Sequence, residues 1–422
     1  MNLSDLKKLY GNMYMTVLFR KEYRANLQII REWWISEERA LLAVAIVTMT
    51  TCALVRLSIE FYRLVWLNHW AGAIDLKMRY REVHSWFTGI PIYVELGYAV
   101  YPPASYCILW PLLGWLPLMQ ARLLWGAFIL VMLGWLIYLL VRESYAKTDI
   151  ERLFIALLVP SGYAANVAIG NGQNIVYILP ALITGMLLIR KEGKLYQDLL
   201  GAALILITLV SPTIAAPFFW LVLFVPGRLR PAVLVVLGYV VLTVLAWSFQ
   251  EGSLVSLIRA WLEIGERGAR AGSVAGGYSN VHSFLTPLEL KAWNRIASLV
   301  ILGVLGIWIY RNRRVDIWLL IGVSSIAARL WTYHRNYDDL LIMLPAIALF
   351  RIAKSGQTAD GSDIIAGGLL AVTWAFMLSP IRLLKSHPPL YQFTHNLQLI
   401  LWLVILLFLL YKARREKMAS VR

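Results

Sequence analysis

The clearest candidate for chemistry is Asp75, which lies in a polar insertion between two apolar segments. A carboxylate beside a bilayer is costly unless it meets water, a partner or a ligand. One role that suits it is general base, taking a proton from an attacking hydroxyl group. The alternative is structural: Asp75 caps a helix and pairs with Arg79 one turn later.

A second candidate is the polar break 333–339 between two apolar segments, which contains His334 and Arg335. Polar and charged groups at such a place favour function, and these two side chains could hold a phosphate. The alternative is a simple turn in which Arg335 pairs with Asp338 or Asp339.

The short turn 169–174 carries Asn171 and Gln173, whose amides could bind a sugar or a phosphate. Its glycines, Gly170 and Gly172, are equally well explained by a turn that links two helices.

The composition predicts that membrane-spanning segments hold these candidate residues in place. Of 422 residues, 59% are hydrophobic and 15% are charged, and apolar runs of about 15 to 20 residues recur, close to the length that spans a bilayer as a helix. The sequence therefore predicts an all-α polytopic membrane protein, because only helices or closed barrels satisfy their backbone in lipid.

The formal charge of +16 gathers in short clusters beside the apolar runs. This pattern is the positive-inside signature of membrane proteins and argues against a nucleic-acid partner. Cys52 and Cys107 both lie in apolar segments and indicate no metal site.

Thirteen apolar segments are candidates for crossings, but the basic clusters place both termini in the cytoplasm, so the number must be even. We expect about twelve crossings, with 103–141 as the region where one segment does not cross fully. We expect a basic cytoplasmic or interfacial segment at 1–38 with no cleavable signal, one membrane domain at 39–411, and a basic cytoplasmic tail at 412–422. Outer loops are expected at 58–102 and 250–291.

The first outer loop contains a predicted amphipathic helix from Asp75 to Phe87. One face carries Leu76, Tyr80, Val83 and Phe87, and another carries Asp75, Arg79, Glu82 and Trp86. Such a helix lies in the membrane interface rather than crossing it. Gly89 and Pro91 are expected to end it.

The motifs of this region resemble glycosyltransferase family 87. The resemblance rests on the order Asp75-x4-Tyr80, Gly89-x-Pro91-x-Tyr93 and Tyr101-Pro102-Pro103, followed by Gly172-Gln173-Asn174. The segment Trp331–His334 is similar to the family's aromatic-plus-His element, and Asn280-Val-His-Ser283 loosely to its Asn-Gln-Ser element. One departure is Val210-Ser211-Pro212-Thr213, where the family usually has a Lys before the Pro.

The resemblance implies a GT-C fold and transfer of a sugar, mannose in the first instance, from a polyprenyl phosphate to a glycolipid or glycan acceptor. It implies that Asp75 is the base at the extracytoplasmic face of the cell membrane. The donor is a lipid-linked substrate, so neither a cofactor nor a metal is expected. The site residues expected on this basis fall into two groups: His334, Arg335, Gln173 and Arg79 for the donor phosphate, and Tyr80, Tyr93, Tyr101, Asn171, Asn280 and His282 for the substrate cavity.

Two other functions fit a polytopic membrane protein. A lipid or solute transporter would favour charged or broken helices in two matched halves, whereas the polar residues here gather in loops on one expected face. Another enzyme of the GT-C class would keep the chemistry and move the catalytic residues.

Overall fold

The structure, a computed structural model, describes residues 40–190, 193–274, 280–285, 293–356, 360–379 and 386–419, with single positions at 28, 29, 32, 36, 37, 290, 358 and 384. Nearly all of the segment 1–38 lies outside the described residues, as do residues 420–422 of the expected tail. Every regular element in the described part is a helix. The expectation of an all-α polytopic membrane protein is confirmed.

Within the described part, five helices are long and apolar enough to cross a membrane, and a bent pair forms a sixth candidate. Six further apolar helices are shorter. The long helices are Ala40–Val65, α5 (Leu118–Glu143), α12 (Arg230–Trp247), α15 (Asn294–Asn312) and α20 (Pro388–Ala419), and the pair, bent by 46°, is α6 (Asp149–Ser161) with α7 (Tyr163–Asn171).

The shorter apolar helices fill the rest of the bundle. They are α4 (Pro103–Leu113), α8 (Ile175–Ile189), α9 (Leu195–Thr208), the segment Pro212–Phe224 (α10, η1 and α11), α16 (Ile317–Leu330) and α18 (Ser362–Met377). The 3-10 helix η3 (Asn336–Ile342) leads into α17 (Met343–Lys354), which is buried along most of its length.

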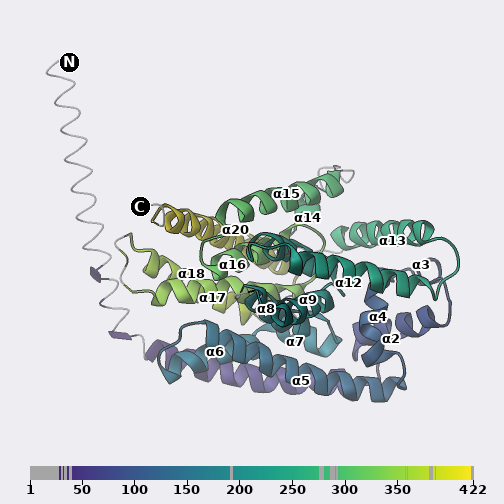
Figure 1. Cartoon of the computed structure of the whole chain (residues 1–422). Helices are drawn as coiled ribbons and strands as arrows, with labels where there is room; N and C mark the ends of the chain where they lie inside the picture. The colour runs from purple at the N-terminus through teal and green to yellow at the C-terminus, as the bar shows by residue number, and fades with distance from the viewer. Residues whose placement is uncertain are drawn as a thin grey trace.

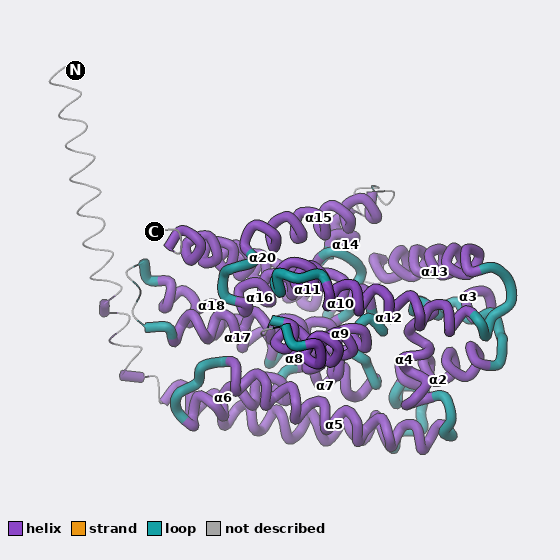
Figure 2. The backbone as a smooth tube through the Cα atoms, viewed as in Figure 1, coloured by secondary structure: helices purple, strands orange, loops and turns teal. Residues whose placement is uncertain are grey.

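Two ends of the bundle can be distinguished. Figure 1 draws α2 (Ile74–Phe87) and α13 (Leu254–Val274) at one end and the end of α20 at the other. Figure 2 shows the loop after α12 turning back into α13 at the first of these ends. We call them the α2 end and the C-terminal end.

The doubtful region 103–141 contains two helices of unequal length. Helix α4 has 11 residues and α5 has 26. At about 1.5 Å per residue α4 rises roughly 16 Å, about half of the hydrocarbon thickness. It therefore cannot cross alone, while the total of about twelve crossings stays a prediction.

The first helix continues further than its apolar run. It extends to Val65 rather than ending near residue 57, so the expected loop 58–102 begins about eight residues later. Glu60 and Arg63 lie in this last part and form an ion pair with each other. Their spacing of three residues allows the pair to form along one helix face.

Helix α2 has nearly the predicted bounds, and Gly89 follows it with φ of 80°. Its charged face, however, turns into the protein: Arg79, Glu82 and Trp86 are all buried. The Trp86 indole donates to the carbonyl of Ala246 at the end of α12, 2.9 Å away. The polar stripe of α2 therefore faces the bundle and can line a site.

Candidate functional site

Asp75 lies in the first turn of α2 but does not cap it. The N-cap is Ala73, which has left-handed backbone angles and makes no side-chain cap. Arg79 forms its ion pair with Glu82, at 2.7 Å. The structural alternative for Asp75, a cap paired with Arg79, is therefore not the arrangement observed.

The surroundings of the Asp75 carboxyl group are mixed. Burial raises its pKa, while the amides of Gln173 and Asn171 and the charges of Arg79 and Arg335 oppose that shift. Its Oδ2 atom is buried without a hydrogen-bond partner among the described residues. This oxygen therefore has the capacity to accept a hydrogen bond from a further group.

The turn between α7 and α8 brings the two amides to Asp75. Gly172 adopts φ of 75°, and a Cβ atom there would lie 2.5 Å from Cβ of Leu76. The turn is thus pressed against the start of α2, which places Asn171 and Gln173 beside Asp75. Gly172 is required both for its backbone angle and for this close approach.

Arg79 and Tyr101 form the next part of the site. The Arg79 guanidinium lies over the Tyr101 ring, 4.2 Å from its centroid. Asn174 donates from Nδ2 to the Tyr101 hydroxyl at 3.0 Å. Burial raises the pKa of Tyr101 to about 12, so this hydroxyl stays protonated at neutral pH.

The other two tyrosines have different surroundings. Tyr93 donates to the carbonyl of Tyr101 at 2.6 Å, so it holds the backbone of Tyr101 in place. Tyr80 donates to the carbonyl of Leu116 at 3.0 Å and lies against His84. It is directed to the connection between α4 and α5 rather than to Asp75.

The segment 331–339, which includes the start of η3, forms the side of the site opposite α2, and we call it the 331–339 wall. His334 is buried, and its Nδ1 lies 3.1 Å from Oδ2 of Asp338. Its Nε2 is buried without a hydrogen-bond partner among the described residues. Arg335 is exposed, and its charge reaches Asp75.

The carboxylates that could have paired with Arg335 have other partners. Asp338 accepts the backbone N–H of Arg335 at 2.9 Å in addition to its contact with His334. Asp339 forms a fully buried ion pair with Arg329 of α16, at 2.6 Å. The segment is thus more than a simple turn closed by Arg335.

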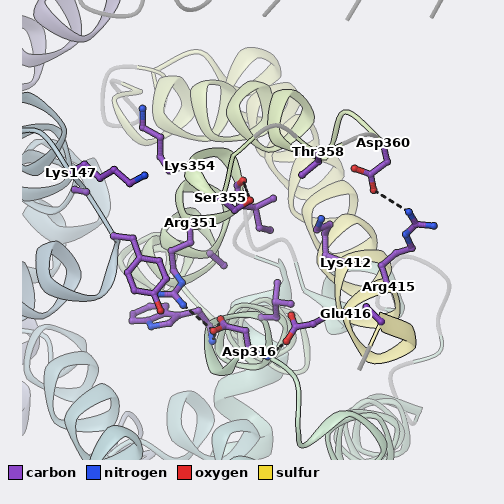
Figure 3. A pocket seen from close by; sticks show the side chains of 17 residues that line it. Lys147, Asp316, Arg351, Lys354, Ser355, Thr358, Asp360, Lys412, Arg415 and Glu416 are labelled. Atoms are coloured by element: carbon purple, nitrogen blue, oxygen red, sulfur yellow. Dashed lines mark hydrogen bonds and ion pairs between the residues drawn. The ribbon is translucent and has the colours of Figure 1, made fainter. Parts of the chain in front are cut away.

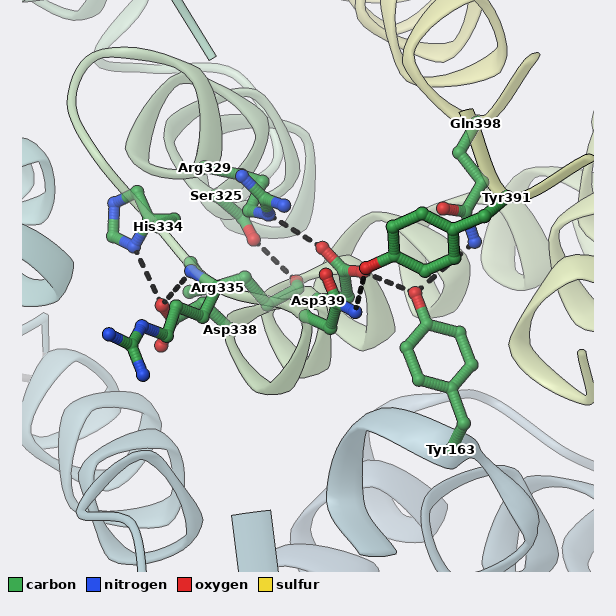
Figure 4. Close-up of polar contacts among 11 residues, drawn as sticks. Tyr163, Ser325, Arg329, His334, Arg335, Asp338, Asp339, Tyr391 and Gln398 are labelled. Atoms are coloured by element: carbon green, nitrogen blue, oxygen red, sulfur yellow. Dashed lines mark hydrogen bonds and ion pairs between the residues drawn. The ribbon is translucent and has the colours of Figure 1, made fainter. Parts of the chain in front are cut away.

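A buried polar network anchors this wall, as Figure 4 shows. The Tyr163 hydroxyl of α7 donates to Asp339, and Gln398 of α20 donates to that hydroxyl at 3.2 Å. With Arg329 this connects α7, α16, η3 and α20. The network fixes η3, and with it the position of His334.

His282 lies near enough to His334 for the two imidazoles to interact, and Asn280 stands two residues before His282. Asn280 and His282 are both buried, and His282 Nε2 is 2.9 Å from the Ser298 hydroxyl. Burial lowers the pKa of His282, and the nearby His334 lowers it further. The Ser298 hydroxyl in turn donates to the carbonyl of Trp331 at 2.6 Å, which joins this group to the same wall.

The segment without the expected Lys also reaches this wall. The Trp331 indole donates to the carbonyl of Thr213 at 2.7 Å. The hydroxyls of Ser211 and Thr213 lie 3.2 Å apart. This chain therefore has two hydroxyls at the position where the resemblance led us to expect a Lys.

Sequence reasoning missed three residues at the site. Tyr337 is near enough to Asp75, Asp338 and Arg335 for their charges to act on it. Asn174 holds Tyr101, and Arg63 binds Asn171 at 3.0 Å. Asn174 stood within a quoted motif, and the Glu60–Arg63 spacing was a readable signal, whereas nothing in the sequence singled out Tyr337.

A separate cleft of about 1030 Å³ lies at the C-terminal end. Figure 3 shows Arg351 beside Asp316 and Arg415 beside Asp360 there. Its lining residues are a different set from the predicted site residues. Within the described residues, no group of three or more His, Cys, Asp or Glu could hold a metal ion.

The comparisons with known proteins bear on this site directly. The sequence model of glycosyltransferase family 87 matches residues 99–353. The match includes Tyr101, the 169–174 turn and the 331–339 wall, and begins after α2. Searches of curated proteins and of solved structures found no match to the chain. Because the match covers more than half of its length, the chain belongs to glycosyltransferase family 87.

Proposed function

We propose that the protein transfers a sugar, mannose in the first instance, from a polyprenyl phosphate to a lipid or glycan acceptor. Transfer inverts the anomeric centre, and Asp75 is the general base. The observation that carries the proposal is the Asp75 carboxyl group, with an unpartnered buried Oδ2 beside two amides and the charges of Arg79 and Arg335.

The base step follows from this environment. The acceptor hydroxyl gives its proton to Asp75 as its oxygen forms a bond to C1 of the sugar. The bond between C1 and the phosphate oxygen breaks from the opposite side, and the lipid phosphate leaves with the bonding electrons. A carboxylate whose pKa is raised by burial is a stronger base than one in water.

The leaving phosphate needs positive charge and hydrogen-bond donors rather than an acid. Arg335 supplies a guanidinium at the exposed edge of the site. His334 has Nδ1 on Asp338, and its protonated form presents an Nε2 proton to an anion. Donors fixed before the reaction stabilise such developing charge without reorganisation.

We place the site at the extracytoplasmic face of the cell membrane, with both termini in the cytoplasm. Basic residues gather at the C-terminal end, where the lining of the cleft includes Lys147, Arg351, Lys354, Lys412 and Arg415. The positive-inside rule supports a cytoplasmic position for this end. The α2 end, which carries Asp75, then faces outward.

A transporter without transferase activity is the weaker candidate. Family membership supports a glycosyltransferase. The predicted site residues also gather at one end of the bundle, whereas a carrier's binding groups are typically near the bilayer midplane.

The test is transfer by purified protein from polyprenyl-phosphate-mannose to a panel of glycolipid acceptors. We expect Asp75→Asn to reduce the rate by about 10²–10⁴-fold, the usual contribution of a general base. The control is Asp149→Asn, since the Asp149 side chain is 98% exposed and lies in the first turn of α6. Full transfer by Asp75→Asn would overturn the base assignment, and transfer only from another lipid-linked sugar would overturn the choice of mannose.

A further inference from the structure

We propose that Arg63 is a positioning residue, which orients the Asn171 side chain so that its amide N–H groups face the Asp75 carboxylate. The proposal rests on the function proposed above and concerns a residue outside the segment that matches the family. Arg63 acts through Asn171 and is not assigned a contact with substrate.

The hydrogen bonds of Arg63 define its task. Its Nη2 donates to Oδ1 of Asn171 and to the carbonyl of Ala71, both at 3.0 Å. Its Nη1 pairs with Glu60 one turn earlier on the same helix. One guanidinium therefore joins the first helix, the chain that leads into α2, and the turn after α7.

The contact with Arg63 fixes the orientation of the Asn171 amide group, that is, where its oxygen and its nitrogen lie. An amide has one oxygen that accepts and one nitrogen that donates. Because the oxygen accepts from Arg63, the nitrogen is the group left for Asp75, which stands next to Leu76, the residue against which Gly172 packs. Against the burial that raises the pKa of Asp75, the Asn171 amide accordingly acts to lower this pKa, although its effect is smaller than those of Gln173, Arg79 and Arg335. Without Arg63 the amide could turn its oxygen toward Asp75, which would repel the charged form.

Packing shows that the Glu60–Arg63 pair is built into the fold. A Cβ atom at Gly170 would lie 1.8 Å from Oε2 of Glu60 and 2.7 Å from Nη1 of Arg63. The two side chains are only 5% and 16% exposed. The pair thus occupies the space left by Gly170 and is held against α7, unlike a solvated surface pair.

The backbone of Arg63 is held as well. Arg122, near the start of α5, donates to the carbonyls of Leu64 at 2.8 Å and Leu67 at 3.0 Å. It also donates to the carbonyl of Arg63 itself at 3.2 Å. The bonds to Arg63 and Leu64 satisfy carbonyl groups in the last turn of the first helix, which have no partners within the helix, and the bond to Leu67 holds the chain just after it.

The test measures the protonation of Asp75 without any substrate. A hydrophobic carbodiimide modifies protonated carboxyl groups, so labelling of Asp75 against pH, read by mass spectrometry of the purified protein, reports its titration. Asp149 in the same sample is the exposed reference. We expect Arg63→Gln to move the Asp75 midpoint to higher pH, which gives more labelling of Asp75 at a pH above both midpoints, while labelling of Asp149 stays unchanged.

Two further variants separate positioning from charge and from misfolding. Arg63→Lys keeps the charge but cannot bridge Asn171 and Ala71, so we expect most of the same shift. Asn171→Ala should itself raise the midpoint, and adding Arg63→Gln to it should raise it little more. An unchanged midpoint in Arg63→Lys, or an equally large Arg63→Gln shift in the Asn171→Ala background, would overturn the proposal.

The outcome is independent of the base assignment. If Asp75→Asn keeps full transfer while the labelling shifts appear, the proposed function fails and the positioning role stands. If Asp75→Asn loses transfer and no labelling shift appears, only the role of Arg63 is lost.

Discussion

Replacing Gly172 by alanine should both destabilise the protein and slow sugar transfer. Gly172 has φ of 75°, and an added Cβ would lie 2.5 Å from Cβ and 3.4 Å from Cα of Leu76. Leu76 is fully buried, so its side chain has no open space to move into. The whole start of α2, including Asp75, must shift instead.

The magnitude follows from two separate costs. A left-handed conformation costs an L-residue about 1–2 kcal/mol, and overpacking a well-packed site costs about 1–3 kcal/mol. The loss in folding free energy is therefore about 2–5 kcal/mol. A displacement of about 1 Å in a catalytic group can lower the rate about 100-fold.

The assay pairs thermal unfolding in detergent with the transfer rate from polyprenyl-phosphate-mannose. The control is Gly134→Ala in α5, where an added Cβ meets nothing within 4 Å and alanine favours the helix. We expect a lower melting temperature and a lower rate for Gly172→Ala only. A Gly172→Ala protein with the rate and melting temperature of wild type would refute the view that this contact positions Asp75.

Three further predictions concern charged groups. Because burial raises the pKa of Asp75, ionisation of this carboxyl group weakens the fold as the pH rises. We therefore expect Asp75→Asn to raise the melting temperature at pH 7. This gain in melting temperature should shrink toward pH 4. Burial raises the pKa of Glu82 from 4.5 to about 7 although the ion pair with Arg79 opposes this shift. The protein should therefore lose stability as the pH rises from about 4.5 to about 7, and Glu82→Gln should flatten this dependence in melting curves. Arg329→Ala leaves the buried Asp339 carboxylate without its positive partner, with only the Tyr163 hydroxyl still donating to it, and should cost about 3–5 kcal/mol in chemical unfolding. Arg152→Ala, in an exposed pair, should cost less than about 1 kcal/mol, and equal losses would contradict this.

Local patterns predicted much of the fold. The 3.6-residue period and Gly89 predicted the extent of α2 to within one residue. The first helix was predicted too short because Glu60 and Arg63 interrupt the apolar run, and composition does not show that they pair with each other. The apolar run 103–120 hid a break at residues 114–117, where α4 ends and α5 has not begun.

The site was predictable where one segment carries its own signal. Asp75, Gln173 and His334 each lie in a polar break of the sequence. The periodicity also separated the two faces of α2, but it could not show that the charged face is buried as well as the apolar one. That depends on Trp86 bonding to Ala246, a residue 160 positions away.

The segment 170–172 shows how a local explanation can be true and incomplete. Its glycines predicted a turn between helices, and the structure has Gly172 at that turn while Gly170 and Asn171 still belong to α7. In the folded chain each glycine also makes room for a distant residue: Gly170 for the Glu60–Arg63 pair and Gly172 for Leu76. Asn171, between them, is thereby held between the first helix and α2.

The buried polar atoms without partners give the most general argument for a ligand. Among the described residues they include Oδ2 of Asp75, Oδ1 of Asn174 and Nε2 of His334, from three separate segments. A buried polar atom without a partner costs about 1–3 kcal/mol. Such atoms also occur elsewhere among the described residues, as at Trp125 and Trp402, so it is the chemistry of these three atoms, rather than their number, that points to a ligand. A sugar phosphate offers what they need, because its hydroxyls donate to the two oxygens and its phosphate accepts from a protonated His334. The same atoms that weaken the fold would therefore strengthen binding, as expected of a site shaped by its substrate.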